Sequence, residues 1–197
     1  MSTLESSTST NAMPSSDTIL SMMKHASDRR DAASGPINDA RAGSEPRARA
    51  MGRVVAVCIS PGGVPKTPVP EAQLTAAGFV GDGHDHEKHI RPHRAVLIQD
   101  EEKLEELRRE GYALAPGTLG ENLTVRDLHV QSLAPGTQLR LENGPLLQLS
   151  EPRRPCFVLD QIDPRLQDVV VGRCGYLASV IESGPVRAGQ RITVVCQ

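Results

Sequence analysis

Short runs of apolar residues separated by turn-forming residues fill the chain from residue 53 onward, and this pattern predicts many short strands. The runs at 53–60 and 95–99 are typical of buried strands, because each is short and rich in Val, Ile and Leu. Residues 67–75 contain Pro68 and Pro70, which favours an extended edge segment. Further strands are expected at residues 122–125, 138–141, 146–150, 176–182 and 191–195.

Residues 100–110 have the pattern of a helix. Asp100 is a suitable N-cap, acidic residues fill the first turn, basic residues fill the last turn, and Gly111 follows. Leu104 and Leu107 form a single apolar stripe that would face a core.

Turn signals connect the predicted strands. Residues 142–145 (Glu-Asn-Gly-Pro) predict a hairpin between the strands on either side, and Gly184-Pro185 and Gly189 predict turns between the last two strands. About eight short strands with one or two short helices indicate a mainly β protein, a small and partly closed β-barrel.

Residues 1–50 differ in composition from the rest and predict a disordered N-terminal tail, which leaves residues 51–197 as the folded domain. The tail is rich in Ser, Thr, Gly and Pro, so it cannot bury enough apolar surface to offset the entropy of ordering. Residues 18–26 could form a transient amphipathic helix. Six bases are matched by six acids, which argues against a transit peptide. Met51 stands where the dense pattern begins, so translation starting there is one explanation of the tail.

Charge and hydropathy exclude two classes of partner. The net charge is −2 and no basic, aromatic-containing patch is present, so nucleic acid is not expected as a partner. No apolar run approaches the ~18 residues that cross a membrane. The four cysteines form no CxxC pair and no secretory signal precedes them, so we expect reduced thiols and a cytoplasmic location.

Cys156 has the most distinctive surroundings of the four cysteines. It follows Glu-Pro-Arg-Arg-Pro at 151–155, where two prolines stiffen the loop and two arginines would favour a thiolate, which is a metal ligand and a nucleophile. The alternative is a small buried apolar residue. Cys58 and Cys196 are expected to be inert, and Cys174, in a glycine turn, could approach Cys156.

Residues 82–93 hold four histidines and three acids. In extended backbone His84 and His86 would point to the same side, which could form a zinc or nickel site; the alternative is a solvated polar loop. Arg94, at the start of a buried strand, is better placed as a fixed contact for an anion.

Two glycine-containing turns could also meet a ligand. Residues 116–122 and 61–66 allow tight turns whose N–H groups could cradle phosphate, although such turns are often structural only.

Taken in order, six segments resemble the MOSC family, named after the C-terminal domain of molybdenum-cofactor sulfurase. They are GGVPK at 62–66, GFVGDGH at 78–84, HRAVLI at 93–98, PGTLGENLTV at 116–125, EPRRPC at 151–156 and GYLASVIESGPVRAGQRI at 176–192. They cover nearly all of residues 53–195, and the resemblance is to stand-alone bacterial-type members.

The resemblance implies a β-barrel-like domain that binds molybdenum cofactor or carries sulfur. The conserved cysteine of the family corresponds to Cys156 in this chain. In the related amidoxime-reducing proteins that family cysteine ligates molybdenum. Matched motif by motif, the remaining cofactor-binding candidates are the cations Lys66, Arg94 and Arg153, the cleft residues Asp82 and His84, and the shaping or contacting residues Glu121 and Asn122.

Three functions follow as alternatives. The first is a molybdenum-dependent reductase of N-hydroxylated compounds, which needs a separate electron donor because no flavin, haem or iron–sulfur motif is present. The second is a carrier in which a Cys156 persulfide delivers sulfur to a metal centre, with a sulfurtransferase as partner. The third is a metal-binding module that uses the histidines. The sequence matches neither the extra N-terminal barrel of the amidoxime-reducing proteins nor the desulfurase domain of the sulfurases, so pyridoxal phosphate is not expected.

Overall fold

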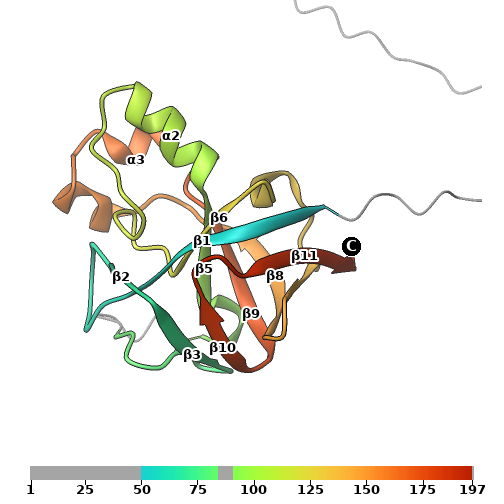
Figure 1. Ribbon diagram of the computed structural model, residues 1–197. Helices are drawn as coiled ribbons and strands as arrows, with labels where there is room; N and C mark the ends of the chain where they lie inside the picture. Colours follow the sequence, from blue (N-terminus) through green and yellow to red (C-terminus); the bar gives the residue numbers. More distant parts are fainter. Residues whose placement is uncertain (1–49, 84–90, 197) are drawn as a thin grey trace, which may run out of the picture. The chain divides into compact units, whose positions relative to one another are not determined.

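A computed structural model describes residues 50–83 and 91–196 (Figure 1). The strands are β1 (Met51–Ile59), β2 (Thr67–Val69), β3 (Glu71–Thr75), β4 (Gly78–Phe79), β5 (Val96–Asp100), β6 (Leu123–Arg126), β7 (Gln138–Leu141), β8 (Leu146–Pro152), β9 (Tyr176–Glu182), β10 (Gly184–Arg187) and β11 (Arg191–Cys196). The helices are α2 (Glu101–Arg109) and α3 (Leu166–Val169), with short 3-10 segments η2 (Pro92–Arg94), η3 (Val130–Ser132) and η4 (Phe157–Gln161). None of the helices in this part of the chain is long and apolar enough to cross a membrane.

Seven of the described strands close into a barrel. Their order is β11-β7-β8-β9-β5-β6-β1, and β1 pairs with β11 to complete the ring. All neighbours are antiparallel except β5 and β6, which run parallel because α2 connects them. The predicted mainly β barrel with few helices is confirmed, and so is the hairpin at 142–145, which joins β7 to β8.

A second, three-stranded sheet with the order β10-β3-β4 corrects two predictions. Gly184 and Pro185 belong to strand β10, which pairs with β3, rather than to a turn; Pro185 is tolerated because β10 is an edge strand. Residues 67–75 form two strands separated at Pro70. Only β2 is an edge, since β3 has a partner on each side.

Aliphatic side chains form the core in two clusters. The larger cluster fills the barrel with Val, Leu and Ile from nearly every strand. The smaller cluster includes Leu104 and Leu107 of α2, Leu159 of η4 and Leu166 of α3. Helices α2 and α3 lie together at one end of the barrel (Figure 1). The predicted apolar stripe of the helix is therefore confirmed.

Asp100 precedes α2 as predicted, but its carboxylate does not cap the helix. Its oxygens instead accept hydrogen bonds from the backbone N–H groups of Val130 (2.9 Å) and Gln131 (3.4 Å), which fasten η3 to the end of β5. Burial raises the pKa of this carboxyl above its ordinary value. The acids of the first helical turn have partners of their own: Glu101 pairs with Arg108, and Oε1 of Glu102 accepts the backbone N–H of Asp127 at 2.8 Å.

The predictions for residues 1–49, including the disordered tail and the helix at 18–26, concern residues outside the described part of the chain.

Candidate functional site

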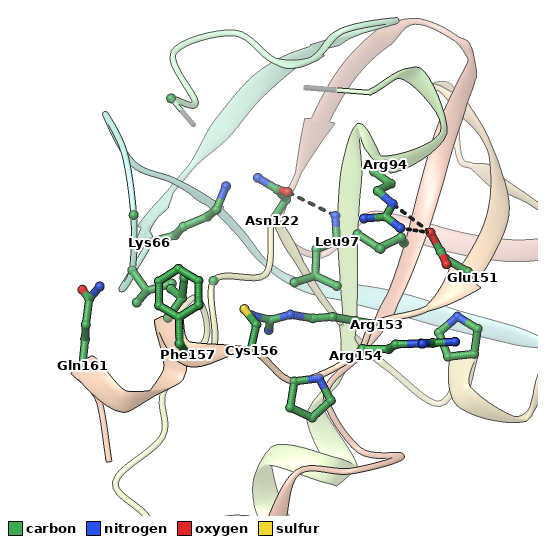
Figure 2. Close-up of a pocket in the computed structure, with 18 residues that line it drawn as sticks. Lys66, Arg94, Leu97, Asn122, Glu151, Arg153, Arg154, Cys156, Phe157 and Gln161 are labelled. Atoms are coloured by element: carbon green, nitrogen blue, oxygen red, sulfur yellow. Dashed lines mark hydrogen bonds and ion pairs between the residues drawn. The ribbon is translucent and has the colours of Figure 1, made fainter. Parts of the chain in front are cut away.

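A cleft of about 640 Å³ opens at one end of the barrel (Figure 2). It is lined by residues 151–158 and by Gly63, Val64, Lys66, Gly83, Arg94, Leu97, Gly120, Asn122, Gln161 and Leu177. The lining residues come from all six family-like segments and from the stretch that follows Cys156, so the fold gathers motifs that lie far apart in the sequence.

Cys156, the residue that the sequence analysis singled out, lies on the wall of this cleft. Strand β8 ends at Pro152, and the N–H of Arg153 still donates to the carbonyl oxygen of Gly175 at 2.9 Å. Cys156 has an extended backbone (φ −148°, ψ 168°) at the N-terminus of η4. Its carbonyl oxygen accepts the N–H of Leu159 at 3.0 Å, so η4 fixes the position of the half-buried thiol.

The other two cysteines with described side chains are buried free thiols. Burial raises the pKa of Cys58 to about 12, so this thiol remains protonated, in accord with the prediction that it is inert. Cys174 donates a hydrogen bond from Sγ to the carbonyl oxygen of Arg153 at 3.1 Å, and burial raises its pKa as well. Cys174 thus braces the backbone three residues before Cys156, and the two are not joined by a disulfide.

Lys66 and Asp82 form a nearly buried ion pair beside the cleft, with 8% and 2% of their side chains exposed. Lys66 lines the cleft, whereas Asp82 lies behind the wall and accepts hydrogen bonds from the backbone N–H of Ser60 (3.0 Å) and from Nδ2 of Asn122 (2.8 Å). Asp82 was predicted to line the cleft. It acts instead as the partner that compensates the charge of Lys66.

Asn122 and Glu121 are adjacent but have different surroundings. Asn122 lines the cleft and ties strands together, since its Oδ1 accepts the N–H of Leu97 (3.2 Å) and its Nδ2 also donates to the carbonyl oxygen of Cys58 (3.3 Å). Glu121 is fully buried and does not line the cleft, so its role is to shape the site. Burial raises its pKa, and Oε2 has no partner within the described residues.

The turn at residues 117–120 supports both walls of the cleft through its carbonyl groups. The Gly117 carbonyl accepts the N–H of Lys66 at 2.8 Å, and the Leu119 carbonyl accepts Nη1 of Arg153 at 2.6 Å. The N–H groups of Gly117, Thr118 and Gly120 are used inside the turn, by Oε1 of Glu121, by the Ala115 carbonyl and by the Gly117 carbonyl. The idea that these N–H groups cradle phosphate is therefore wrong.

Arginines gather at one end of the cleft, which we call the cationic end: Arg94, Arg153 and Arg154, with Glu151. Arg94 pairs with Glu151 through Nε (2.8 Å) and Nη2 (2.7 Å), and both side chains are partly exposed. Arg154 is exposed and has no ion-pair partner within the described residues. Arg94 and Arg153 were predicted from the sequence; Glu151 was not, because 57 residues separate it from Arg94.

A wall of uncharged side chains lies on the side of the cleft where Lys66 is found, away from Arg94 and Arg154, and the sequence analysis missed it (Figure 2). This neutral wall consists of Val64, Phe157, Val158 and Gln161. Three of the four follow Cys156 directly along η4, and that adjacency was the signal that could have identified them.

The predicted roles of His84 and His86 concern residues outside the described part of the chain. Within the described residues no group of three or more His, Cys, Asp or Glu side chains is arranged to hold a metal ion.

Comparisons with known proteins bear on the family and the fold of the chain. A family model described as the MOSC domain matches residues 85–193. A protein named Reductase from Gibberella moniliformis is 29% identical over 131 residues, which are 61% of this chain and 23% of that protein. The chain therefore spans about a quarter of the length of this relative.

Solved structures share the fold. YiiM from Escherichia coli is 28% identical with a TM-score of 0.56, covering 74% of this chain and 70% of that one. YuaD from Bacillus subtilis has a TM-score of 0.66 over 76% of this chain and 98% of that one; at 19% identity it supports the fold alone.

Proposed function

The chain belongs to the MOSC domain family, and from that premise we propose that it binds molybdenum cofactor in the cleft and reduces N-hydroxylated compounds there. Cys156 is the protein ligand to molybdenum in this proposal. The observation that carries it is the position of the Cys156 thiol, which lies on a cleft lined by four cationic side chains and one anionic side chain. The curated relative named Reductase supports the same class of reaction.

The donor set fits the cofactor. A thiolate is a soft ligand suited to such a metal. Within the described residues no cluster of three or more metal-binding side chains surrounds Cys156. A metal that arrives already chelated by an organic cofactor needs only one ligand from the protein, which is what Cys156 provides.

The charges of the cleft also fit an organic cofactor that carries phosphate. Arg153 and Arg154 have no carboxylate partner within the described residues, so their positive charge is available to a phosphate group. Lys66 and Arg94 are matched by Asp82 and Glu151, so they would contribute hydrogen bonds more than net charge. The volume of about 640 Å³ lies within the range typical of small-molecule sites.

When bound, the molybdenum cofactor supplies a centre that passes two electrons to a substrate. Reduction of an N-hydroxylated compound breaks the N–O bond, consumes two electrons and two protons, and yields the amine and water. In this proposal the electrons come from a separate donor. The cleft walls hold the substrate near Cys156 and restrict access of water.

A sulfur carrier is the second candidate, and the accessibility of Cys156 favours it. Cys156 is partly exposed while Cys58 and Cys174 are buried, so a sulfurtransferase could reach this thiol alone among the three and leave a persulfide on it. The persulfide would then be passed on to a metal centre.

Elemental analysis and intact mass of protein from a molybdenum-replete host separate the two candidates. A reductase should carry molybdenum that is lost from Cys156→Ser and retained by the control Cys58→Ala, which removes a buried thiol that does not line the cleft. A carrier should instead gain roughly 32 Da, one sulfur atom, only when Cys156 is present. Equal molybdenum in the wild type and Cys156→Ser would refute the ligand role.

A further inference from the structure

A second free thiol, that of Cys174, lies against the segment 153–156 that carries Cys156. Cys174 is fully buried, and its Sγ donates to the carbonyl oxygen of Arg153 at 3.1 Å. The thiol therefore points at the backbone that leads to Cys156. The proposed cofactor role uses Cys156 alone and gives Cys174 no chemical task.

The pairing of β8 with β9 brings the two cysteines close together. The N–H of Arg153 donates to the carbonyl oxygen of Gly175 at 2.9 Å, which continues this antiparallel pairing by one residue. The next position of the same register sets Arg154 opposite Cys174, and Cys156 follows two residues later. Diagonal neighbours of this kind have Cα atoms about 7–8 Å apart. A disulfide needs roughly 7 Å or less, so a small movement of the segment is enough to join the two sulfur atoms.

The two thiols differ in exposure, which gives them different parts. Cys156 is half-buried on an open cleft, so a small oxidant reaches it first. Cys174 is held in place, since a Cβ atom added at the neighbouring Gly175 would lie 2.5 Å from the carbonyl oxygen of Ile98. Burial is the main cause of the raised pKa of Cys174, and the charge of Cys156 raises it further, so the two groups are near enough to interact.

We propose that Cys156 and Cys174 form a reversible disulfide when the protein meets hydrogen peroxide. In the first step the Cys156 thiolate attacks a peroxide oxygen, the O–O bond breaks and hydroxide leaves, which converts Cys156 to a sulfenic acid. In the second step the sulfur of Cys174 attacks the Cys156 sulfur and the S–O bond breaks. The departing hydroxide leaves as water with the proton of Cys174. Each cysteine sulfur gives up one electron, and the peroxide takes up two.

The disulfide protects the exposed cysteine from damage. A sulfenic acid that finds no thiol is oxidised further to a sulfinic acid, which thiol reductants do not reverse, whereas a disulfide is restored by reduction. Cys156 in a disulfide also has no thiolate to offer to a metal. This last consequence alone rests on the proposed function; the disulfide itself does not.

Peptide mapping of full-length protein from a molybdenum-depleted host tests the pair. After treatment with hydrogen peroxide, remaining thiols are blocked with N-ethylmaleimide and the protein is digested with trypsin without reduction. The four cysteines then fall in four different peptides. We expect peptide 154–165 to be linked to peptide 174–187 and the link to disappear with dithiothreitol. No link in the wild type, or a link from Cys156 to Cys58 or Cys196 instead, would overturn the proposal.

Substitution isolates the part played by Cys174. Cys174→Ser keeps a donor for the carbonyl oxygen of Arg153 but cannot form the disulfide, so sulfinic acid at Cys156 should increase at least about tenfold. Cys58→Ala removes a buried thiol elsewhere and should leave the link intact. Equal sulfinic acid in the wild type and Cys174→Ser would contradict the protective role. The wild-type map needs no substitution, so the test of the link does not depend on how the variants fold.

The outcome is distinguishable from failure of the proposed function. Protein that forms the disulfide but holds no molybdenum when prepared from a replete host contradicts the cofactor role and supports the pair. Protein that holds molybdenum but forms no disulfide when prepared without the metal supports the cofactor role and overturns the pair.

Discussion

Gly117 packs so closely on Lys66 that a Cβ atom at position 117 would lie 2.2 Å from the carbonyl oxygen of Lys66. The same contact includes the 2.8 Å hydrogen bond from the N–H of Lys66 to the carbonyl oxygen of Gly117. Gly117 also has a φ of +87°, a conformation that favours glycine. The turn at 117–120 can therefore approach the wall of the cleft only because position 117 has no side chain.

Gly117→Ala should destabilise the domain by roughly 3 kcal/mol or more, because it adds a backbone clash to an unfavourable φ. Gly172→Ala is the matched control: its φ is +71°, but nothing lies within 4 Å of the added Cβ, so about 1 kcal/mol is expected. Urea unfolding followed by circular dichroism measures both. Similar losses in the two variants would mean that the contact with Lys66 carries little energy.

The features that depend on local sequence were predictable. The strand and turn patterns indicated a small barrel, the proline-stiffened loop singled out Cys156, and the order of the motifs brought Lys66, Arg94, Asn122 and Arg153 to one cleft. Each prediction used residues that are close in sequence or a family resemblance that already contains the tertiary arrangement.

The features that depend on distant contacts were not predictable. Nothing around Asp82 indicates that its carboxylate turns behind the cleft wall to meet Lys66, and nothing around Asp100 indicates that it binds the N–H of Val130 in place of its own helix. Strand β10 was assigned as a turn because Gly184 and Pro185 are local turn formers, whereas pairing with β3 decides the outcome. In these cases tertiary hydrogen bonds outweigh local preference.

The three cysteines with described side chains should differ sharply in reactivity. Alkylation of the native protein with iodoacetamide, followed by peptide mass mapping, should modify Cys156 at least about a hundredfold faster than Cys58, because only a thiolate in contact with solvent reacts. Cys58 is fully buried with a pKa of about 12, and Cys174 is also buried. In concentrated urea the three rates should converge. Rapid alkylation of Cys58 or Cys174 in the folded protein would contradict the assigned burial.

Glu121 should make the stability of the domain depend on pH. Burial raises its pKa in the folded state, whereas in the unfolded chain it titrates near 4.5. Above that pH the unfolded chain releases the proton and the folded protein keeps it. The free energy of unfolding therefore falls as pH rises toward the folded pKa, by up to about 1.4 kcal/mol per unit.

Glu121→Gln keeps an oxygen that accepts hydrogen bonds from Gly117 and Thr124, but its side chain cannot titrate. The free energy of unfolding of this variant, relative to that of the wild type, should therefore increase from pH 4.5 upward. Asp100, whose pKa is also raised, is unchanged in both proteins and cancels in the difference. Urea unfolding at intervals of about half a pH unit between pH ~4 and ~7 measures the difference in free energy of unfolding between the two proteins. A difference that is independent of pH would show that the Glu121 carboxyl is ionised in the folded state.

The pairing of Arg94 with Glu151 should set how strongly the cationic end attracts an anion. Glu151→Gln removes the one anionic side chain among the described residues that line the cleft and frees Arg94, so inorganic phosphate should bind roughly threefold more tightly. Arg94→Gln should weaken phosphate binding. Both effects should fade as ionic strength rises, since the pair is partly exposed. Glu142→Gln frees Arg191 from an exposed pair outside the cleft and serves as the control. Broadening of the ³¹P signal of phosphate at low salt gives the affinities, and equal gains in Glu151→Gln and Glu142→Gln would reduce the effect to one of net charge.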